Sequence, residues 1–480
     1  MLYLIMPAYE IKSWNGGFAD LEDVGTEGSA KFISGADIRK RRNTLSCNQA
    51  LVEDAPVGMF TDLAMFQVPS VTGSLYFFCR DGKIIRRNSS GTYLLVYTDP
   101  DGAILGAAES SDDEGSIFLH WATATKLKVK KLQGTAYTPQ EPWTDQNSVV
   151  PHNGGTYPKT DLTSATFHTM LWAVGNLYIA NDTKIAIAGR DGGYSNEILR
   201  LFPEFSAKCL LERAKSLIVG CKNKAGQESA GYFGWDCGES LNYDIEKTLP
   251  TISINAMIDT EKPLLQVGTD GQIITCNFED ILPLKAFPGG GQCNPDAVCG
   301  HSGMALFGVA GNGAGNTGVY SFGRKVLGMP FVLNLEYPLT CDEIGSVKKM
   351  GSDVFVTYRL GSSYGVKKLS STLKETAIFQ SLDYRGPANI ETDRPIWKGF
   401  KVETRPLPAG CSIRCYRRID NTGDFIVGQL DDGAEVFNTE GGTSAVFNFG
   451  DEGDVCEFQV ILTPNGNLTP EVKKAFLTVE

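Results

Sequence analysis

The stretch Leu75–Arg86, LYFFCRDGKIIR, has the form of two short β-strands joined by an Asp-Gly turn. The form recurs at Phe118–Val129 (FLHWATATKLKV), Leu177–Ile187 (LYIANDTKIAI) and Leu264–Thr275 (LLQVGTDGQIIT). In each copy an apolar strand leads through a polar turn to a second strand that opens near Lys or Gln. A hairpin repeated at intervals of tens of residues indicates a repeat architecture, and it favours a rigid scaffold over a compact enzyme core.

The second strands of the hairpins give the length of the repeat. Seven residues mark them, four clearly and then three more weakly: Lys83, Lys126, Lys184, Gln272, Tyr232, Val319 and Val366. Successive markers are 40 to 58 residues apart, which is room for four strands of about 5–6 residues with their turns. A four-stranded antiparallel unit at this spacing is a propeller blade. The sequence therefore predicts an all-β protein with a β-propeller of about seven blades; a solenoid is the alternative.

The propeller is predicted to occupy residues 56–387, between two segments of different character. Residues 1–55 are turn-rich, and we expect an extended N-terminal arm that could supply a closing strand. Residues 388–480 hold about six strand patterns and predict a small β-sandwich. Residues 134–164 show no periodicity, so we expect a functional or mobile loop there.

Composition narrows the range of functions. The net charge of −12 argues against non-specific nucleic-acid binding, which needs basic side chains to replace counterions. No apolar run reaches the ~18 residues of a membrane span, and the opening Met1–Met6 lacks the basic segment of a secretory signal. Several of the 12 cysteines lie in apolar strand patterns, where a thiol behaves as a small hydrophobe. We therefore expect reduced thiols and assembly in a cytosol.

Motifs that would indicate catalysis or metal binding are incomplete. Cys293, Cys299 and His301 could form a metal clip, but their spacing is not that of a zinc site and no fourth ligand is evident. Ser110–Phe118 (SSDDEGSIF) is loosely similar to the Asp-box turn of sialidase-type propellers. A sialidase also needs an arginine cluster, a tyrosine nucleophile and paired carboxylates, and no such set is marked. We expect no enzyme activity, no cofactor and no metal.

Five residues are candidates for docking to a partner protein. Arg39, Arg41 and Arg42 belong to the one basic run of the chain, IRKRR. In an acidic chain, docking of this run against an acidic neighbouring subunit is at least as favoured as contact with nucleic acid. Trp14 lies in the arm, and Trp143 lies in the segment without periodicity, where it is either a binding platform or a core residue.

The order of these parts resembles that of structural proteins of tailed bacteriophages, especially the propeller-bearing proteins of the tail and its connectors. In the arm, Trp14, Gly16–Gly17, Gly35–Arg39 (GADIR) and Leu45–Leu51 (LSCNQAL) are similar to the opening of such proteins. The close of the chain, with Thr469–Pro470 before a final strand, is similar to their ending. The resemblance implies a virion component of the tail that is assembled in the bacterial cytoplasm. Its partners would be other tail or connector proteins and further copies of itself around a symmetry axis.

Three functions follow as hypotheses. The first is a non-enzymatic structural adaptor of a bacteriophage tail that docks neighbours through the propeller faces, the arm and the sandwich. The second is a glycan-binding or glycan-cleaving propeller in host-surface recognition, which predicts paired pore-facing carboxylates or a stacked aromatic face. The third is an interaction propeller of cellular origin, which predicts a hallmark dipeptide in every blade; Trp235–Asp236 occurs once.

Overall fold

The fold is described from a computed structural model, which covers residues 8–19, 28–39, 43–134, 141–144, 157–191, 193–238, 243–277, 280–311, 313, 315–324, 328, 330–386 and 394–480. Within these ranges the chain forms strands and no helix, so the predicted all-β class is confirmed. The described residues include no helix that is long and apolar enough to cross a membrane. The chain divides into two compact units. We call residues 53–318 with 340–368 the ring unit, and residues 1–52, 319–339 and 369–480 the split unit.

The ring unit is a succession of antiparallel sheets. Its strands are β7 (Ala64–Pro69), β8 (Leu75–Cys79), β9 (Lys83–Arg87), β10 (Tyr93–Thr98), β11 (Gly106–Ser111), β12 (Ile117–Ala122), β13 (Leu127–Gln133), β14 (Met170–Ala173), β15 (Asn176–Asn181), β16 (Lys184–Gly189), β17 (Tyr194–Arg200), β18 (Phe205–Arg213), β19 (Ser216–Asn223), β20 (Ala230–Trp235), β21 (Ile245–Leu249), β22 (Ile254–Asp259), β23 (Pro263–Val267), β24 (Gln272–Asn277), β25 (Asp280–Ala286), β26 (Val298–His301), β27 (Met304–Val309), β30 (Glu343–Met350), β31 (Asp353–Leu360) and β32 (Ser363–Lys374). These strands pair in chain order within each sheet, as local hairpins require.

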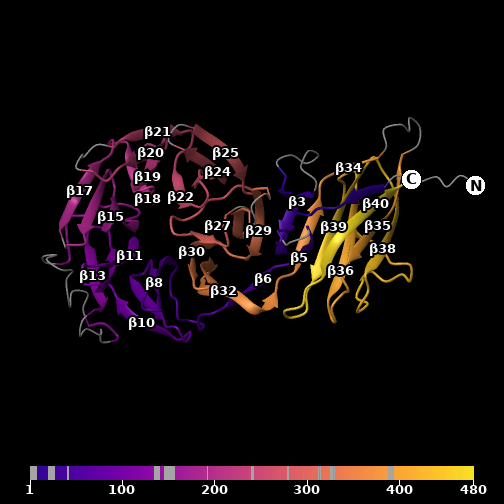
Figure 1. Ribbon diagram of the computed structural model, residues 1–480, viewed down its shortest axis with the longest axis horizontal. Helices are drawn as coiled ribbons and strands as arrows, with labels where there is room; N and C mark the ends of the chain where they lie inside the picture. Colours follow the sequence, from indigo (N-terminus) through magenta and orange to yellow (C-terminus); the bar gives the residue numbers. More distant parts are fainter. Residues whose placement is uncertain are drawn as a thin grey trace, which may run out of the picture. The chain divides into compact units, whose positions relative to one another are not determined.

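The innermost strands of these sheets follow one another around a closed ring (Figure 1). β7 contacts β11, and the contacts continue through β14, β18, β22 and β26 to β30, which contacts β7 again. Each of these strands is the first of its sheet, so every sheet extends outward from the ring. This radial arrangement of antiparallel sheets is the architecture of a β-propeller.

The repeat markers of the sequence fall on equivalent strands. Lys83, Lys184 and Gln272 open β9, β16 and β24, each the third strand of its sheet. Lys126 directly precedes β13, and Tyr232 lies within β20, which are also third strands. The Asp-Gly turn before Lys83 works because its glycine has a φ of 86°, a conformation that costs glycine little. The repeated hairpins are therefore the second and third strands of successive sheets.

Polar side chains join the first sheet of the ring to the last. Gln67 on β7 donates through Nε2 to Ser346 Oγ on β30 at 2.8 Å, and Thr357 Oγ1 on β31 donates to the carbonyl oxygen of Ala64 at 2.7 Å. The backbones approach so closely that a Cβ at Gly345 would lie 2.1 Å from the Ala64 oxygen. Glycine is therefore required where the ring closes.

A second link between these sheets comes from Glu53 and Asp54, which we call the clasp. Strand β6 (Gln49–Glu53) is the outermost strand of the sheet β30–β31–β32. Glu53 accepts a hydrogen bond from Tyr358 on β31 at 2.6 Å. Asp54 accepts from Arg87 Nε on β9 at 2.5 Å and from the Tyr93 hydroxyl on β10 at 2.7 Å. The clasp therefore holds the first and last sheets of the ring together with residues that precede both in the chain.

The split unit draws its strands from three parts of the chain. They are β1 (Ala8–Ile11), β2 (Gly17–Phe18), β3 (Ser29–Ser34), β4 (Ala36–Asp37), β5 (Leu45–Cys47), β28 (Gly318–Gly323), β29 (Val332–Pro338), β33 (Ala377–Ser381), β34 (Tyr384–Arg385), β35 (Ile396–Thr404), β36 (Ser412–Ile419), β37 (Ile426–Val427), β38 (Ser444–Glu452), β39 (Val455–Thr463) and β40 (Glu471–Val479). One sheet has the order β38–β35–β40–β5–β4, with β1 on β40, while β29, β3, β33, β39, β36 and β37 are successive neighbours in another. Phe400 on β35 and Phe458 on β39 bring the two sheets together, with ring centroids 4.3 Å apart.

These units do not coincide with the three predicted segments, 1–55, 56–387 and 388–480. The N-terminal residues form no separate arm, because β1 pairs with β40 and β3 pairs with β33. Residues 319–339 and 369–386 lie within the predicted propeller segment, yet they group with the C-terminal strands. The difference arises because strand pairing in the split unit is non-local, which hydrophobic periodicity does not report.

Candidate functional site

A cavity of about 400 Å³ lies on the axis of the ring unit. Every inner strand supplies a lining residue: Phe66 from β7, Ala107 from β11, Met170 from β14, Leu210 from β18, Met257 from β22, Val298 from β26 and Lys348 from β30. We call it the axial cavity. A cavity at the point where all the sheets meet brings residues from every sheet within reach of one ligand or partner.

The axial cavity combines apolar walls with charged groups, and two of its carboxylates form ion pairs. Lys348 Nζ lies 2.6 Å from Asp296 Oδ1, and the backbone N–H of Gln67 donates to Asp296 Oδ2 at 2.8 Å. Burial raises the pKa of Asp296, while Lys348 acts in the opposite direction. Asp259, also in the lining, forms an ion pair with Arg213. Asp296 and Asp259 are held by cations, and Glu212 is a third carboxylate in the lining. The cavity therefore has apolar walls with acidic groups at fixed positions.

The two predicted tryptophans are packed inside their units. Trp14 is fully buried and meets Phe379 edge-on, with ring centroids 4.9 Å apart. Trp143 is buried beside Trp121, at 6.2 Å between ring centroids, and Lys130 Nζ lies 5.7 Å from its ring. Both side chains contribute to hydrophobic cores, which is the usual role of large aromatic residues.

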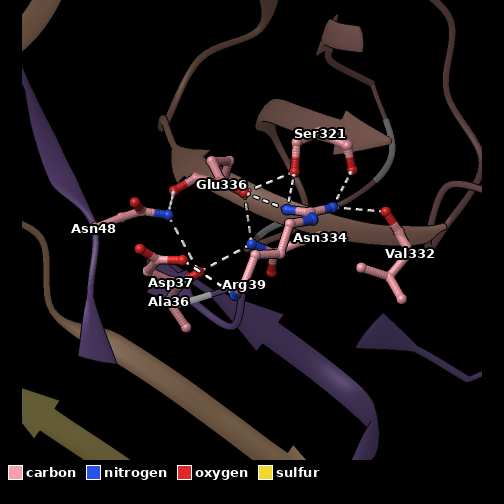
Figure 2. Close-up of polar contacts among 8 residues, drawn as sticks. All are labelled: Ala36, Asp37, Arg39, Asn48, Ser321, Val332, Asn334 and Glu336. Atoms are coloured by element: carbon pink, nitrogen blue, oxygen red, sulfur yellow. Dashed lines mark hydrogen bonds and ion pairs between the residues drawn. The ribbon is translucent and has the colours of Figure 1, made fainter. Parts of the chain in front are cut away.

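Arg39 is also buried, at the centre of a polar network in the split unit (Figure 2). Its Nη1 donates to Glu336 Oε2 at 2.8 Å and to Ser321 Oγ at 2.7 Å. Its Nη2 donates to the carbonyl oxygen of Val332 at 2.6 Å. Asn334 Nδ2 donates to the same Glu336 oxygen at 2.8 Å. Burial lowers the pKa of Arg39, and the adjacent Glu336 carboxylate opposes that effect. The residue therefore joins the N-terminal segment to β28 and β29.

Three of the five predicted docking residues lie among the described residues. Trp14, Arg39 and Trp143 are each buried, which leaves little of each side chain to touch a partner. Arg41 and Arg42 lie outside the described residues. Docking through these five residues stays a prediction. The residues that line the axial cavity were not predicted, because the sequence shows strand periodicity but not which strands meet at an axis.

The sequence predicts no metal site at Cys293, Cys299 and His301, which all lie in the ring unit. Cys293 is buried and Cys299 is half-buried. Across the described ranges, no group of three His, Cys, Asp or Glu side chains is placed to hold a metal ion. Burial raises the pKa of Cys299 to about 12, which disfavours the thiolate that metal binding requires.

Comparison with known proteins gives likenesses of structure only. No protein-family model matches the sequence, and no curated protein matches it. Among solved structures, the WD40 β-propeller domain of Doa1 is 13% identical with a TM-score of 0.45, covering 67% of this chain and 97% of that one. The β-propeller domain of Cps50 (Swd1) from Myceliophteria thermophila is 9% identical with a TM-score of 0.44, covering 65% and 98%. The Pan2 WD40 domain of Neurospora crassa is 10% identical with a TM-score of 0.44, covering 70% and 98%.

Proposed function

We propose that this chain is a non-enzymatic structural adaptor, built as a seven-bladed β-propeller combined with a small β-sandwich. The observation that supports the proposal is the closed succession of inner strands from β7 to β30 around one axial cavity. Such a ring holds many loops on a stiff frame, which suits docking of several partners at once. The clasp and the Gln67 contacts add to this stiffness by fixing the first sheet to the last.

We further propose that the adaptor belongs to a bacteriophage tail and is assembled in the host cytoplasm. The support is the resemblance of the sequence layout to propeller-bearing tail proteins, carried by Trp14, Gly35–Arg39 and Leu45–Leu51. On this proposal the partners are neighbouring tail or connector proteins, and copies of the chain gather around a symmetry axis.

The outer strands of the ring unit offer surface for such partners. Leu94 and Leu95 on β10 are each 39% exposed, and Leu282 on β25 is 53% exposed. Both strands are outermost in their sheets. Outer strands that carry exposed apolar side chains favour protein contact, because burying those side chains stabilises a complex.

Purified virions of a phage that encodes this chain test the proposal. Mass spectrometry of the particles and immunogold labelling of the chain are expected to place it at the tail, in a fixed ratio to the tail proteins. Absence of the chain from washed particles would refute the tail assignment. A reducing-sugar assay on host-surface glycans, run in parallel, is expected to show no cleavage; cleavage would refute the non-enzymatic adaptor.

A further inference from the structure

A second cavity, of about 430 Å³, opens between the sheet β18–β21 and the sheet β22–β25. Its lining is mostly polar and includes Lys208, Lys222, Ser253, Asn255, Thr269 and Gln292. We call it the lysine pocket. Its volume lies within the range of about 300–1,000 Å³ that is usual for small-molecule sites.

The ammonium group of Lys208 is held in place inside the lysine pocket. Its Nζ donates to Asn255 Oδ1 at 2.8 Å and to Ser253 Oγ at 3.3 Å. An ammonium has three N–H donors; two are used here, and the ring of Phe167 lies 5.8 Å from Nζ. Within the described part of the chain, no carboxylate forms an ion pair with Lys208. The pocket therefore presents a cation whose charge is not neutralised by a bonded acid.

A buried amide network fixes the group that holds Lys208. Asn255 Nδ2 donates to Gln266 Oε1 at 2.9 Å and to the carbonyl oxygen of Gly268 at 2.7 Å. Gln266 Oε1 also accepts from the backbone N–H of Cys293 at 3.0 Å. Asn255 and Gln266 are both buried. Because its NH₂ is committed elsewhere, Asn255 must turn its oxygen toward Lys208, so the ammonium is preorganised.

The surroundings of Lys208 disfavour its charged form. Burial lowers the pKa of Lys208 to about 8, and the nearby Lys222 acts in the same direction. A bound anion would offset that cost, since an opposite charge nearby favours the charged form. The titratable groups that face Lys208 or share the pocket lining are Cys209, Cys293, Lys222, Glu228 and Asp270.

We propose that the lysine pocket binds the anionic group of a small hydroxylated ligand, a sugar acid or a sugar phosphate. Lys208 donates to the carboxylate or phosphate oxygen in a charge-assisted hydrogen bond. The hydroxyls of Ser253 and Thr269 and the amide of Gln292 meet the hydroxyl groups of the ligand. This site is separate from the axial cavity and does not depend on the adaptor function.

Titration calorimetry of the full chain tests this site with three probes: D-glucuronate, glucose 6-phosphate and uncharged glucose. For ligands of this size we expect a Kd on the order of 1 mM. The variant Lys208→Met is expected to weaken binding of the anionic probe about tenfold or more, since a charge-assisted hydrogen bond is lost. Lys215→Met is the matched control, because Lys215 is an exposed lysine in the turn of the same hairpin and does not line the pocket.

Lys222→Glu provides a second variant that leaves the pocket interior intact. Lys222 is exposed at the pocket, so reversing its charge is expected to weaken anion binding several-fold without altering thermal unfolding. Binding of glucuronate alone or of glucose 6-phosphate alone supports the proposal and identifies the anionic group. The proposal is overturned by absence of binding at about ten times the expected Kd, by equal affinity for glucose, or by unchanged affinity in Lys208→Met. None of these results bears on whether the chain is present in virions.

Discussion

Replacing Arg39 by methionine is expected to destabilise the split unit strongly. Arg39→Met keeps a long apolar stem but removes the guanidinium that bonds Glu336, Ser321 and Val332. The Glu336 side chain is 1% exposed, so its charge would remain buried without a cation. Breaking a buried ion pair in this way costs about 3–5 kcal/mol.

Two hydrogen bonds to Glu336 remain in Arg39→Met, and they reduce the expected loss of stability. Glu336 Oε2 still accepts from Ser321 Oγ at 2.6 Å and from Asn334 Nδ2 at 2.8 Å. These donors stabilise the carboxylate in part, so we expect a loss at the lower end of the range, about 3 kcal/mol. A loss of that size raises the population of the opened state by about two powers of ten.

Amide hydrogen exchange of β3 and β29 measures this opening locally, because exchange reports the free energy of each segment separately. The control is Arg405→Met, whose arginine is 44% exposed and pairs with Glu471 at 2.9 Å; a surface pair is worth less than about 1 kcal/mol. The double variant Arg39→Met with Glu336→Leu is expected to lose less than the sum of the single losses, since no lone charge remains. A loss below about 1 kcal/mol in Arg39→Met, or full additivity in the double variant, would refute the reasoning.

Three further predictions concern the ring unit. Burial acts to raise the pKa of Asp54, but the Arg87 and Tyr93 hydrogen bonds hold it below the ordinary value. The clasp therefore stabilises the ring unit fully above about pH 4, and this stabilisation is lost as the pH falls through the lowered pKa of Asp54. Urea unfolding midpoints should show this loss in the wild type and not in Asp54→Asn. Gln67→Leu leaves buried partners unbonded and should cost about 1–3 kcal/mol in thermal unfolding, whereas an unchanged midpoint would contradict its role in ring closure. Burial raises the pKa of the thiols, so alkylation at pH 8 should be slow in the native chain. It should be fastest at Cys237 and Cys299, the two cysteines that are only half-buried. Mass spectrometry that finds a fully buried cysteine modified first would contradict this order.

Local pattern was enough to predict the strands but not their partners. The predicted hairpin Leu75–Arg86 falls on β8 and β9, because alternation and turn residues are properties of adjacent positions. The pairing of β1 with β40 joins opposite ends of the chain, and nothing in either segment specifies the other. The ring of inner strands could be inferred only through the spacing of the hairpins.

The candidate sites show the same limit at the level of single residues. Arg39 was predicted as a docking residue because it belongs to a basic run, and its partner Glu336 lies 297 positions away within the apolar strand β29. A single acidic residue inside that strand was the available signal for a buried pair. Lys208 was missed for a similar reason. It sits in β18 between Ala207 and Cys209, both buried, where a lysine is unusual enough to indicate a specific role.

The clasp also sets a condition on biosynthesis. Glu53 leaves the ribosome 305 positions ahead of Tyr358, its partner in the last sheet. At about 5–20 residues per second, it waits roughly 15–60 s before that contact becomes possible. During this interval the first sheet has no neighbour on one side, and its strands are open to wrong pairing. A chain that stops before Tyr358 cannot form this contact, so the clasp links the first and last sheets only in chains that extend past this residue.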